Sequence, residues 1–199
     1  DCAEFRGTDA GGWNDLPCNS TLEYYVVEFG AENDIPIVES TQFTVTVEGP
    51  AISVGSCEEL QTADDEGGSW YATLTLEDDI DCDGQTISSL FSEDNFQGTF
   101  DGDGHTISNF VIDQPEDSQV GLLSQTEGNV TIRDLNLENV SVTASYEAGA
   151  LLGGGDGGFT ITNVHATNVD VTTTAEGLVG GLIGDIDAED GFDSLISNV

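Results

Sequence analysis

The sequence predicts an all-β protein whose main part is a parallel β-helix, a solenoid of stacked coils. Two repeated phrases are the first evidence. A four-residue phrase recurs at intervals of 25, 29 and 35 residues, as Thr106–Asn109, Thr131–Asp134, Thr160–Asn163 and Leu195–Asn198. A glycine-rich phrase recurs at intervals of 28 and 31 residues, as Val120–Leu123, Ala148–Gly153 and Val179–Gly184. Repeats of this length are typical of solenoids.

The residues between the phrases indicate strands rather than helices. Apolar and polar residues alternate around Leu135, Leu137, Val140 and Val142, and again around Val164, Ala166, Val169 and Val171. A period of two is that of a strand with one buried face. Glycines and acidic residues break the runs, so each repeat is predicted to form short strands joined by corners, with successive repeats paired in parallel.

Stacked coils place like side chains above one another, which predicts ladders. One predicted column contains Asn109, Asp134, Asn163 and Asn198, and a second places Asn139 over Asn168. Amides in a column can share hydrogen bonds along the stack. We therefore interpret these residues as structural.

The charge balance is extreme. The chain holds 39 acidic residues against two basic ones, Arg6 and Arg133, for a formal charge of −37, yet 37% of it is hydrophobic. Such a chain folds where carboxylate repulsion is screened, and in molar salt the Debye length falls to about 3 Å. The sequence therefore predicts a halophilic protein; the alternative, an ordinary acidic protein, explains the near-absence of Lys and Arg less well.

The same balance excludes several partners. Nucleic acid and anionic membrane surfaces require basic patches, and two arginines cannot supply one. No run of 18 apolar residues occurs, so we expect no membrane insertion. The expected partners are copies of the chain itself, other surface-assembly subunits, or glycans.

Four cysteines fall in two local pairs, which predicts the disulfides Cys2–Cys18 and Cys57–Cys82. Their spacing does not match zinc ligation. Disulfides imply an oxidising exterior, and the second pair would close a loop that stabilises the first coil by about 3 kcal/mol.

Two regions are expected. Residues 1–50 form an N-terminal β-strand segment with a disulfide-held loop over 1–20 and strands over 22–29 and 42–48. They are either the last part of an immunoglobulin-like domain or strands donated to a neighbouring subunit. Residues 51–199 form the solenoid, with a short helix within 57–66 covering its first coil. We expect the solenoid to continue beyond residue 199.

Several phrases resemble the GLUG-motif repeats of secreted right-handed β-helix proteins. These are Phe96–Asn109 and the glycine-rich phrases, together with Cys57–Gln61 and Leu74–Asp81, which resemble the entry segment of the same proteins. The likeness covers roughly residues 52–199. It implies a right-handed β-helix with a surface or adhesin-like role, and it carries no catalytic residues to transfer.

Two kinds of site remain as candidates. Asp79, Asp81 and Asp83, followed by Gly84, have a calcium-loop spacing, although Leu90 at the twelfth position excludes an EF-hand. The alternative is simply a strand and its turn. Asn19, Asn129 and Asn139 begin N-glycosylation sequons. Asn139 would lose its free amide if it stacks in a ladder.

Enzyme activity is not expected, although parallel β-helices host polysaccharide lyases and hydrolases. A lyase needs a basic residue, and the solenoid offers only Arg133, His105 and His165. The chain is therefore predicted to be a non-enzymatic extracellular module of a halophilic cell-surface or filamentous assembly. The alternative is a glycan-binding adhesin, or a viral tail or spike protein, with sugar near Tyr146 or Phe159.

Overall fold

A computed structural model describes residues 2–6, 12–16, 49–64, 69–187 and 194–199. The chain divides into two compact units, Asp1–Glu48 and Gly49–Val199. In the first unit, β1 (Cys2–Arg6) pairs antiparallel with β2 (Gly12–Leu16). The expectation of a loop over residues 1–20 was therefore wrong in part: residues 2–6 and 12–16 form strands, although β2 contains Gly, Asn and Asp, which are uncommon in strands. The strands expected over 22–29 and 42–48 lie outside the described residues.

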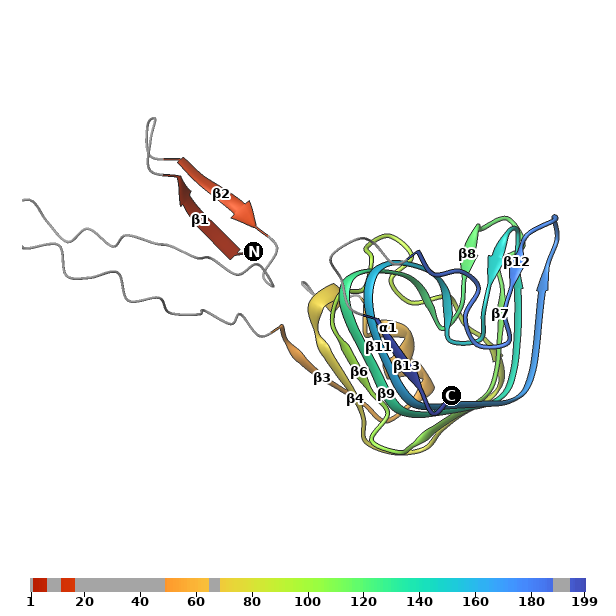
Figure 1. Cartoon of the computed structure of the whole chain (residues 1–199). Helices are drawn as coiled ribbons and strands as arrows, with labels where there is room; N and C mark the ends of the chain where they lie inside the picture. The colour runs from red at the N-terminus through yellow and green to blue at the C-terminus, as the bar shows by residue number, and fades with distance from the viewer. Residues whose placement is uncertain (1, 7–11, 17–48, 65–68, 188–193) are drawn as a thin grey trace, which may run out of the picture. The chain divides into compact units, whose positions relative to one another are not determined.

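The second unit is the predicted parallel β-helix. Its first wall is one parallel sheet of β3 (Ala51–Val54), β4 (Thr73–Leu76), β6 (Thr99–Asp101), β9 (Leu123–Ala144), β11 (Leu152–Thr173) and β13 (Leu195–Ser197). The second wall contains β5 (Ile80–Thr86), β7 (Thr106–Asp113) and the later parts of β9 and β11. The third consists of β8 (Gln119–Val120), β10 (Glu147–Ala148) and β12 (Leu178–Val179). Figure 1 looks along the stack, so that the coils overlap and the walls enclose the interior.

Apolar columns fill that interior. In the first wall the strand register aligns Leu74, Phe100, Ile132 and Ile161, all of them buried. In the second wall Ile80, Ile107 and Leu137 are aligned and buried in the same way. Burial of these side chains is the main stabilising term, at roughly 1.5–3 kcal/mol for each large one.

Two bends turn the long strand β9 from the first wall into the second. Asp134 and Asn139 have positive φ angles of 52° and 56°. At each bend two consecutive residues face outward, and the alternation of buried residues then resumes at Leu135 and at Val140. Asn and Asp are the non-glycine residues that adopt this left-handed conformation most readily, which is why they occupy the corners.

The register corrects one sequence-based alignment. We expected Ile107 to lie in the column of Ile132, Ile161 and Ile196, but it pairs with Leu137, and Phe100 pairs with Ile132 instead. Both corners of a coil read as an apolar residue, a polar residue, a left-handed Asn or Asp, and an apolar residue. The four-residue phrase therefore cannot tell one corner from the other.

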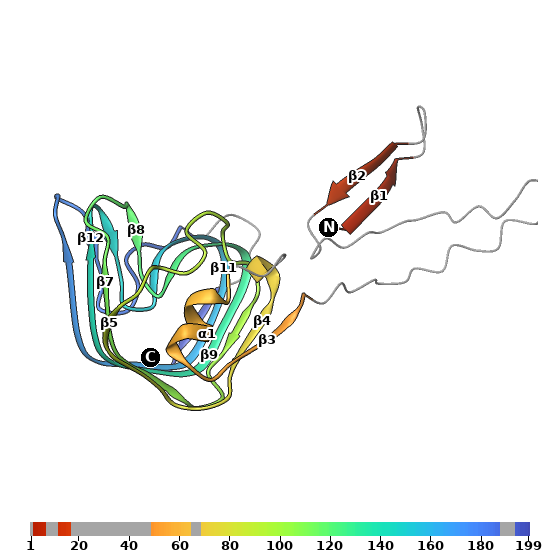
Figure 2. The same cartoon turned by 180° about the vertical axis from the view of Figure 1, so that it is seen from behind.

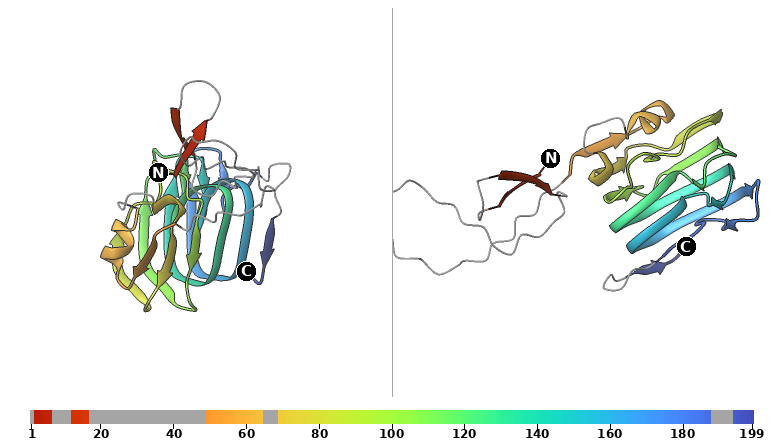
Figure 3. Two further views of the ribbon diagram at one scale, coloured as in Figure 1. Left: turned by 90° about the vertical axis from the view of Figure 1, so that its left-hand side faces the viewer. Right: turned by 90° about the horizontal axis from the view of Figure 1, so that it is seen from above.

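A short helix, α1 (Cys57–Thr62), lies at the N-terminal end of the stack (Figure 3) and inside the outline of the coils (Figure 2). The Ser56 hydroxyl oxygen accepts a hydrogen bond from the backbone N–H of Glu59 at 3.2 Å, which caps the helix, and Leu60 is buried beneath it. Cys57 forms a disulfide with Cys82 of β5, as predicted. A 3₁₀ turn, η1 (Ser69–Tyr71), then leads into β4.

Candidate functional site

The second corner of the coils carries a continuous column of side-chain hydrogen bonds. Asn109 Nδ2 donates to Asp81 Oδ1 at 2.8 Å, Asn139 Nδ2 donates to Asn109 Oδ1 at 2.9 Å, and Asn168 Nδ2 donates to Asn139 Oδ1 at 3.1 Å. The column begins on a carboxylate, which can only accept. We call these four residues the second-corner column.

The first corner carries a similar column. Asn163 Nδ2 donates to Asp134 Oδ1 at 2.7 Å, and Asn198 Nδ2 donates to Asn163 Oδ1 at 2.8 Å. Three of the four residues expected in this ladder therefore lie together. The fourth, Asn109, belongs to the second-corner column. It was assigned to the wrong column because the four-residue phrase is the same at both corners. In both columns the amides bond to neighbouring coils, so they support the stacking of the coils.

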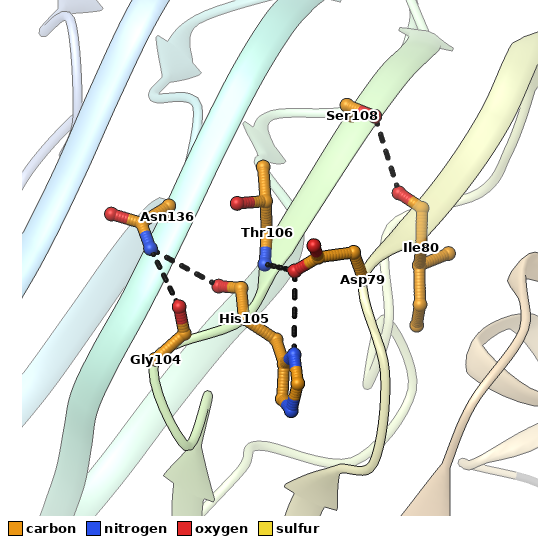
Figure 4. A network of polar contacts seen from close by, with 7 residues as sticks. All are labelled: Asp79, Ile80, Gly104, His105, Thr106, Ser108 and Asn136. Carbon is orange, nitrogen blue, oxygen red and sulfur yellow. Dashed lines mark hydrogen bonds and ion pairs between the residues drawn. The ribbon is translucent and has the colours of Figure 1, made fainter.

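A further group of polar contacts joins three successive coils on the outer surface (Figure 4). Asp79 Oδ1 accepts a hydrogen bond from the backbone N–H of Thr106 at 2.9 Å and lies 3.3 Å from His105 Nδ1. Asn136 Nδ2 donates to the Gly104 carbonyl at 3.0 Å. The hydrogen bond from Thr106 and, after it, the one from His105 hold the pKa of Asp79 below its ordinary value. Sequence reasoning missed this contact, because it depends on which coils are adjacent.

The carboxylates predicted to bind calcium lie on the outside of the first coil. Asp81 Oδ1 also accepts from the backbone N–H of Asp83 at 2.9 Å. The hydrogen bond from Asn109 and, after it, the one from Asp83 lower the pKa of Asp81. Within the described ranges, no group of three or more His, Cys, Asp or Glu side chains is arranged to hold a metal ion. Calcium at Asp79, Asp81 and Asp83 stays a prediction.

The three sequons fall in different settings. Asn129 is exposed in β9 and makes no side-chain hydrogen bond to any described residue, so its amide is accessible to a glycan. Asn139 is also exposed, but its Nδ2, the atom a glycan would be attached to, donates to Asn109. Asn19 lies outside the described residues. Cys18 does too, so the predicted Cys2–Cys18 disulfide stays a prediction.

The three basic side chains considered for catalysis, Arg133, His105 and His165, have different surroundings and do not contact one another. Arg133 Nη2 forms an ion pair with Asp101 Oδ2 at 2.6 Å, and His105 contacts Asp79. Both are engaged with a carboxylate of the preceding coil. His165 is exposed on β11.

The two aromatic residues suggested for sugar binding also differ. Tyr146 is 45% exposed, but Phe159 is 1% exposed and belongs to the core. A Cβ atom on Gly155 would lie 2.8 Å from the Phe159 ring. The glycine-rich run before Phe159 therefore leaves room for the ring inside the coil, and the expectation that Phe159 faces a ligand was wrong.

The C-terminal coil exposes large apolar side chains, and two of them, Val179 and Ile196, are in register with the buried Ala148 and Ile161. The large hydrophobic side chains that are exposed in the described part of the solenoid, apart from Tyr146, are all on this coil: Leu178, Val179, Leu195, Ile196 and Val199. Ile196 is in register with Ile161, yet it is 46% exposed while Ile161 is fully buried.

The helices in the described part of the chain include none with the length and hydropathy of a membrane span.

Comparison with known proteins gives one informative similarity. The chain is 28% identical over 179 residues to a protein named halomucin from Haloquadratum walsbyi. The alignment covers 82% of this chain but 2% of halomucin, so the chain spans a small fraction of that relative. No protein family profile matches the chain, and no solved structure matches it. The similarity to a protein of a haloarchaeon agrees with the acidic composition.

Proposed function

We propose that this chain is a non-enzymatic structural and adhesive module on the outside of a halophile, within a cell-surface or filamentous assembly. The observation that carries the proposal is a closed parallel β-helix whose solenoid unit has Arg133 as its sole Lys or Arg. Such a surface is suited to concentrated salt, where the carboxylates are screened.

The scaffold supports this role through its hydrogen bonds. Every wall is paired by parallel backbone ladders, and two corner columns add side-chain bonds between coils. These bonds join each coil to the next along the stack, so the unit is suited to act as a spacer. The similarity to halomucin favours a haloarchaeal surface, and the Cys57–Cys82 disulfide favours an oxidising compartment.

Surface labelling tests the proposal. An antibody against residues 49–199 should label intact cells of the producing organism in growth-medium salt, and brief protease treatment of those cells should release the antigen. A cytosolic protein of the same organism is the control and should be labelled after lysis alone. Labelling of the solenoid that requires lysis would contradict the proposal.

The resemblance to GLUG-motif repeats is part of this proposal, since it too points to the cell exterior. A glycan-binding adhesin is a second candidate for the same module. One feature favours it: a cavity on the outer surface lined by Trp70.

A further inference from the structure

A cavity of about 270 Å³ lies on the outer surface of the solenoid at the first-wall side. Its lining comes from three successive coils. Trp70 lies in η1 on the first of these coils. Residues 93–97, which precede β6, lie on the next coil, and Glu127 lies in β9 on the third. The complete lining is Trp70, Glu93, Asp94, Asn95, Gln97 and Glu127. We call it the Trp70 cavity.

Backbone hydrogen bonds between coils fix the walls of the Trp70 cavity. The Gln97 N–H donates to the Trp70 carbonyl at 2.6 Å, and the Glu127 N–H donates to the Phe96 carbonyl at 3.1 Å. Asn95 Nδ2 also donates to Glu127 Oε2 at 3.1 Å. Phe96 is fully buried, so the segment that carries Asn95 and Gln97 is anchored in the core. The cavity is therefore a pre-formed feature of the stack.

Trp70 gives the cavity an apolar wall. It is partly buried, packs against the core, and contacts Tyr71 edge to face with ring centroids 4.6 Å apart. An indole held in this way offers a flat apolar surface whose orientation is already set, which lowers the ordering cost of binding. Among the residues that the structure describes, Trp70 is the aromatic side chain that lines the cavity.

The remaining lining is polar and acidic. Asn95 supplies an amide whose Nδ2 donates to Glu127 and whose oxygen can accept, and Glu93, Asp94 and Glu127 supply carboxylates. Amides both donate and accept hydrogen bonds, whereas carboxylates accept. A ligand with many hydroxyl groups and one apolar face satisfies this combination. Three carboxylates in a chain of charge −37 repel an anionic ligand at short range, where salt screens least.

We infer that the Trp70 cavity is a binding site for a neutral saccharide, whose apolar ring face packs on the indole while its hydroxyls bond to the Asn95 amide and the carboxylates. An organic cation is the competing ligand for an aromatic ring beside carboxylates. Cation recognition of that kind uses a cage of several rings, and this cavity has one. The inference rests on the adhesive part of the proposed function, and it can fail while the structural part stands.

Titration of the full chain in about 3 M KCl, where repulsion between charges more than about 3 Å apart is screened, tests the inference. The chain has two tryptophans, Trp13 and Trp70. In a Trp13→Phe background, Trp70 is the one tryptophan left in the sequence and so the indole reporter. Maltotriose and triacetylchitotriose are the neutral probes, trigalacturonate is the anionic probe, and choline is the cationic one. We expect at least one neutral trisaccharide to change the fluorescence, with a Kd of about 1 mM, and no saturable change with trigalacturonate or choline.

Variants decide whether the cavity is responsible. Trp70→Ala should weaken the neutral trisaccharide at least about tenfold by calorimetry, which corresponds to about 1.4 kcal/mol, and Asn95→Ala should weaken it by a smaller factor. Asp170→Asn changes an exposed side chain outside the cavity and should leave binding unchanged. Circular dichroism of each variant in the same buffer confirms that the solenoid is folded. Absence of saturation by both neutral probes overturns the inference, as does saturation by choline alone or binding that survives both Trp70→Ala and Asn95→Ala.

Discussion

Asn139 donates its side-chain Nδ2 to Oδ1 of Asn109 at 2.9 Å, so the corners of two neighbouring coils are joined outside the backbone ladder. Both residues have positive φ angles, 56° and 57°. One residue type therefore meets two requirements at each corner, since Asn tolerates the left-handed backbone and its amide both donates and accepts. Asn139 also accepts from Asn168, which makes it the middle of the second-corner column.

Substitution of Asn139 separates these two contributions. Asn139→Ala loses both column hydrogen bonds and forces a Cβ-bearing residue without a polar side chain into the left-handed region, so we expect the free energy of unfolding to fall by about 2 kcal/mol. Asn139→Gly loses the same hydrogen bonds, but glycine tolerates the left-handed backbone. The free energy of unfolding should therefore fall by about half as much in this variant. Urea denaturation at constant KCl measures both. Equal losses for the two variants would show that the φ angle contributes nothing.

The first-wall column offers a comparison of one residue type in two environments. Ile132 is fully buried and Ile196 is 46% exposed, and both lie in the same column. We expect Ile132→Ala to lower the free energy of unfolding by about 3 kcal/mol, through lost burial and an internal cavity. Ile196→Ala should lower it by less than about 1 kcal/mol, because the surface it removes is half in water already. Similar losses at the two positions would contradict the packing described here.

The Cys57–Cys82 disulfide ties α1 to β5 across 25 residues. Replacing both cysteines with alanine should lower the free energy of unfolding of the solenoid by about 3 kcal/mol, because the unfolded chain regains the freedom of that loop. The control is the pair Cys2→Ala and Cys18→Ala, which lie in the other unit. This control should leave the melting of the solenoid nearly unchanged, and the reverse order of effects would be evidence against the first coil as the site of stabilisation.

Acid should weaken the contacts made by Asp79 and Asp81. Their pKa values in the folded chain are lowered from the ordinary value of 3.8, by hydrogen bonds from Thr106 and from Asn109 respectively. A lowered folded-state pKa adds stability that is fully present above the unfolded-state pKa, and this stability is lost as the pH falls through the folded-state pKa. We therefore expect the melting temperature to fall as the pH drops below about 4.

The double variant Asp79→Asn, Asp81→Asn tests this origin of the acid sensitivity. It should reduce the slope of melting temperature against pH in that window, because neither amide takes up a proton. Asp170→Asn is the matched control: it removes an exposed carboxylate that has no hydrogen bond to any described side chain. If Asp170→Asn flattens the acid limb as much as the double variant does, the two cross-coil contacts are not its cause.

Salt should stabilise the chain through screening of its own charge. Between about 0.1 M and 1 M KCl the Debye length falls from about 10 Å to about 3 Å, so carboxylates on neighbouring coils repel one another less. We expect the melting temperature to rise steeply over this range. A variant that converts four exposed acids to amides should need less salt: Glu116→Gln, Glu138→Gln, Asp170→Asn and Glu176→Gln. An unchanged salt midpoint in that variant would assign the stabilisation to general salt effects on apolar burial.

The sequence by itself determined the fold class, the short N-terminal helix and the Cys57–Cys82 pair. These features depend on local alternation, on a capping serine and on cysteine spacing, all of which can be read within one coil. It also placed Asn139 over Asn168, which are related by a coil without insertions.

Only the tertiary structure decided which corner each Asn occupies, that Phe159 lies in the core, and that Trp70 and Glu127, from coils two apart, line one cavity. The physical reason is that these relationships join residues roughly one or two coils apart, and coil length varies along the chain. A local phrase fixes the conformation of a corner, because φ preference is a property of one residue. Which corner lies above it depends on the register of the whole parallel ladder, and that register is set by the packing of the enclosed side chains.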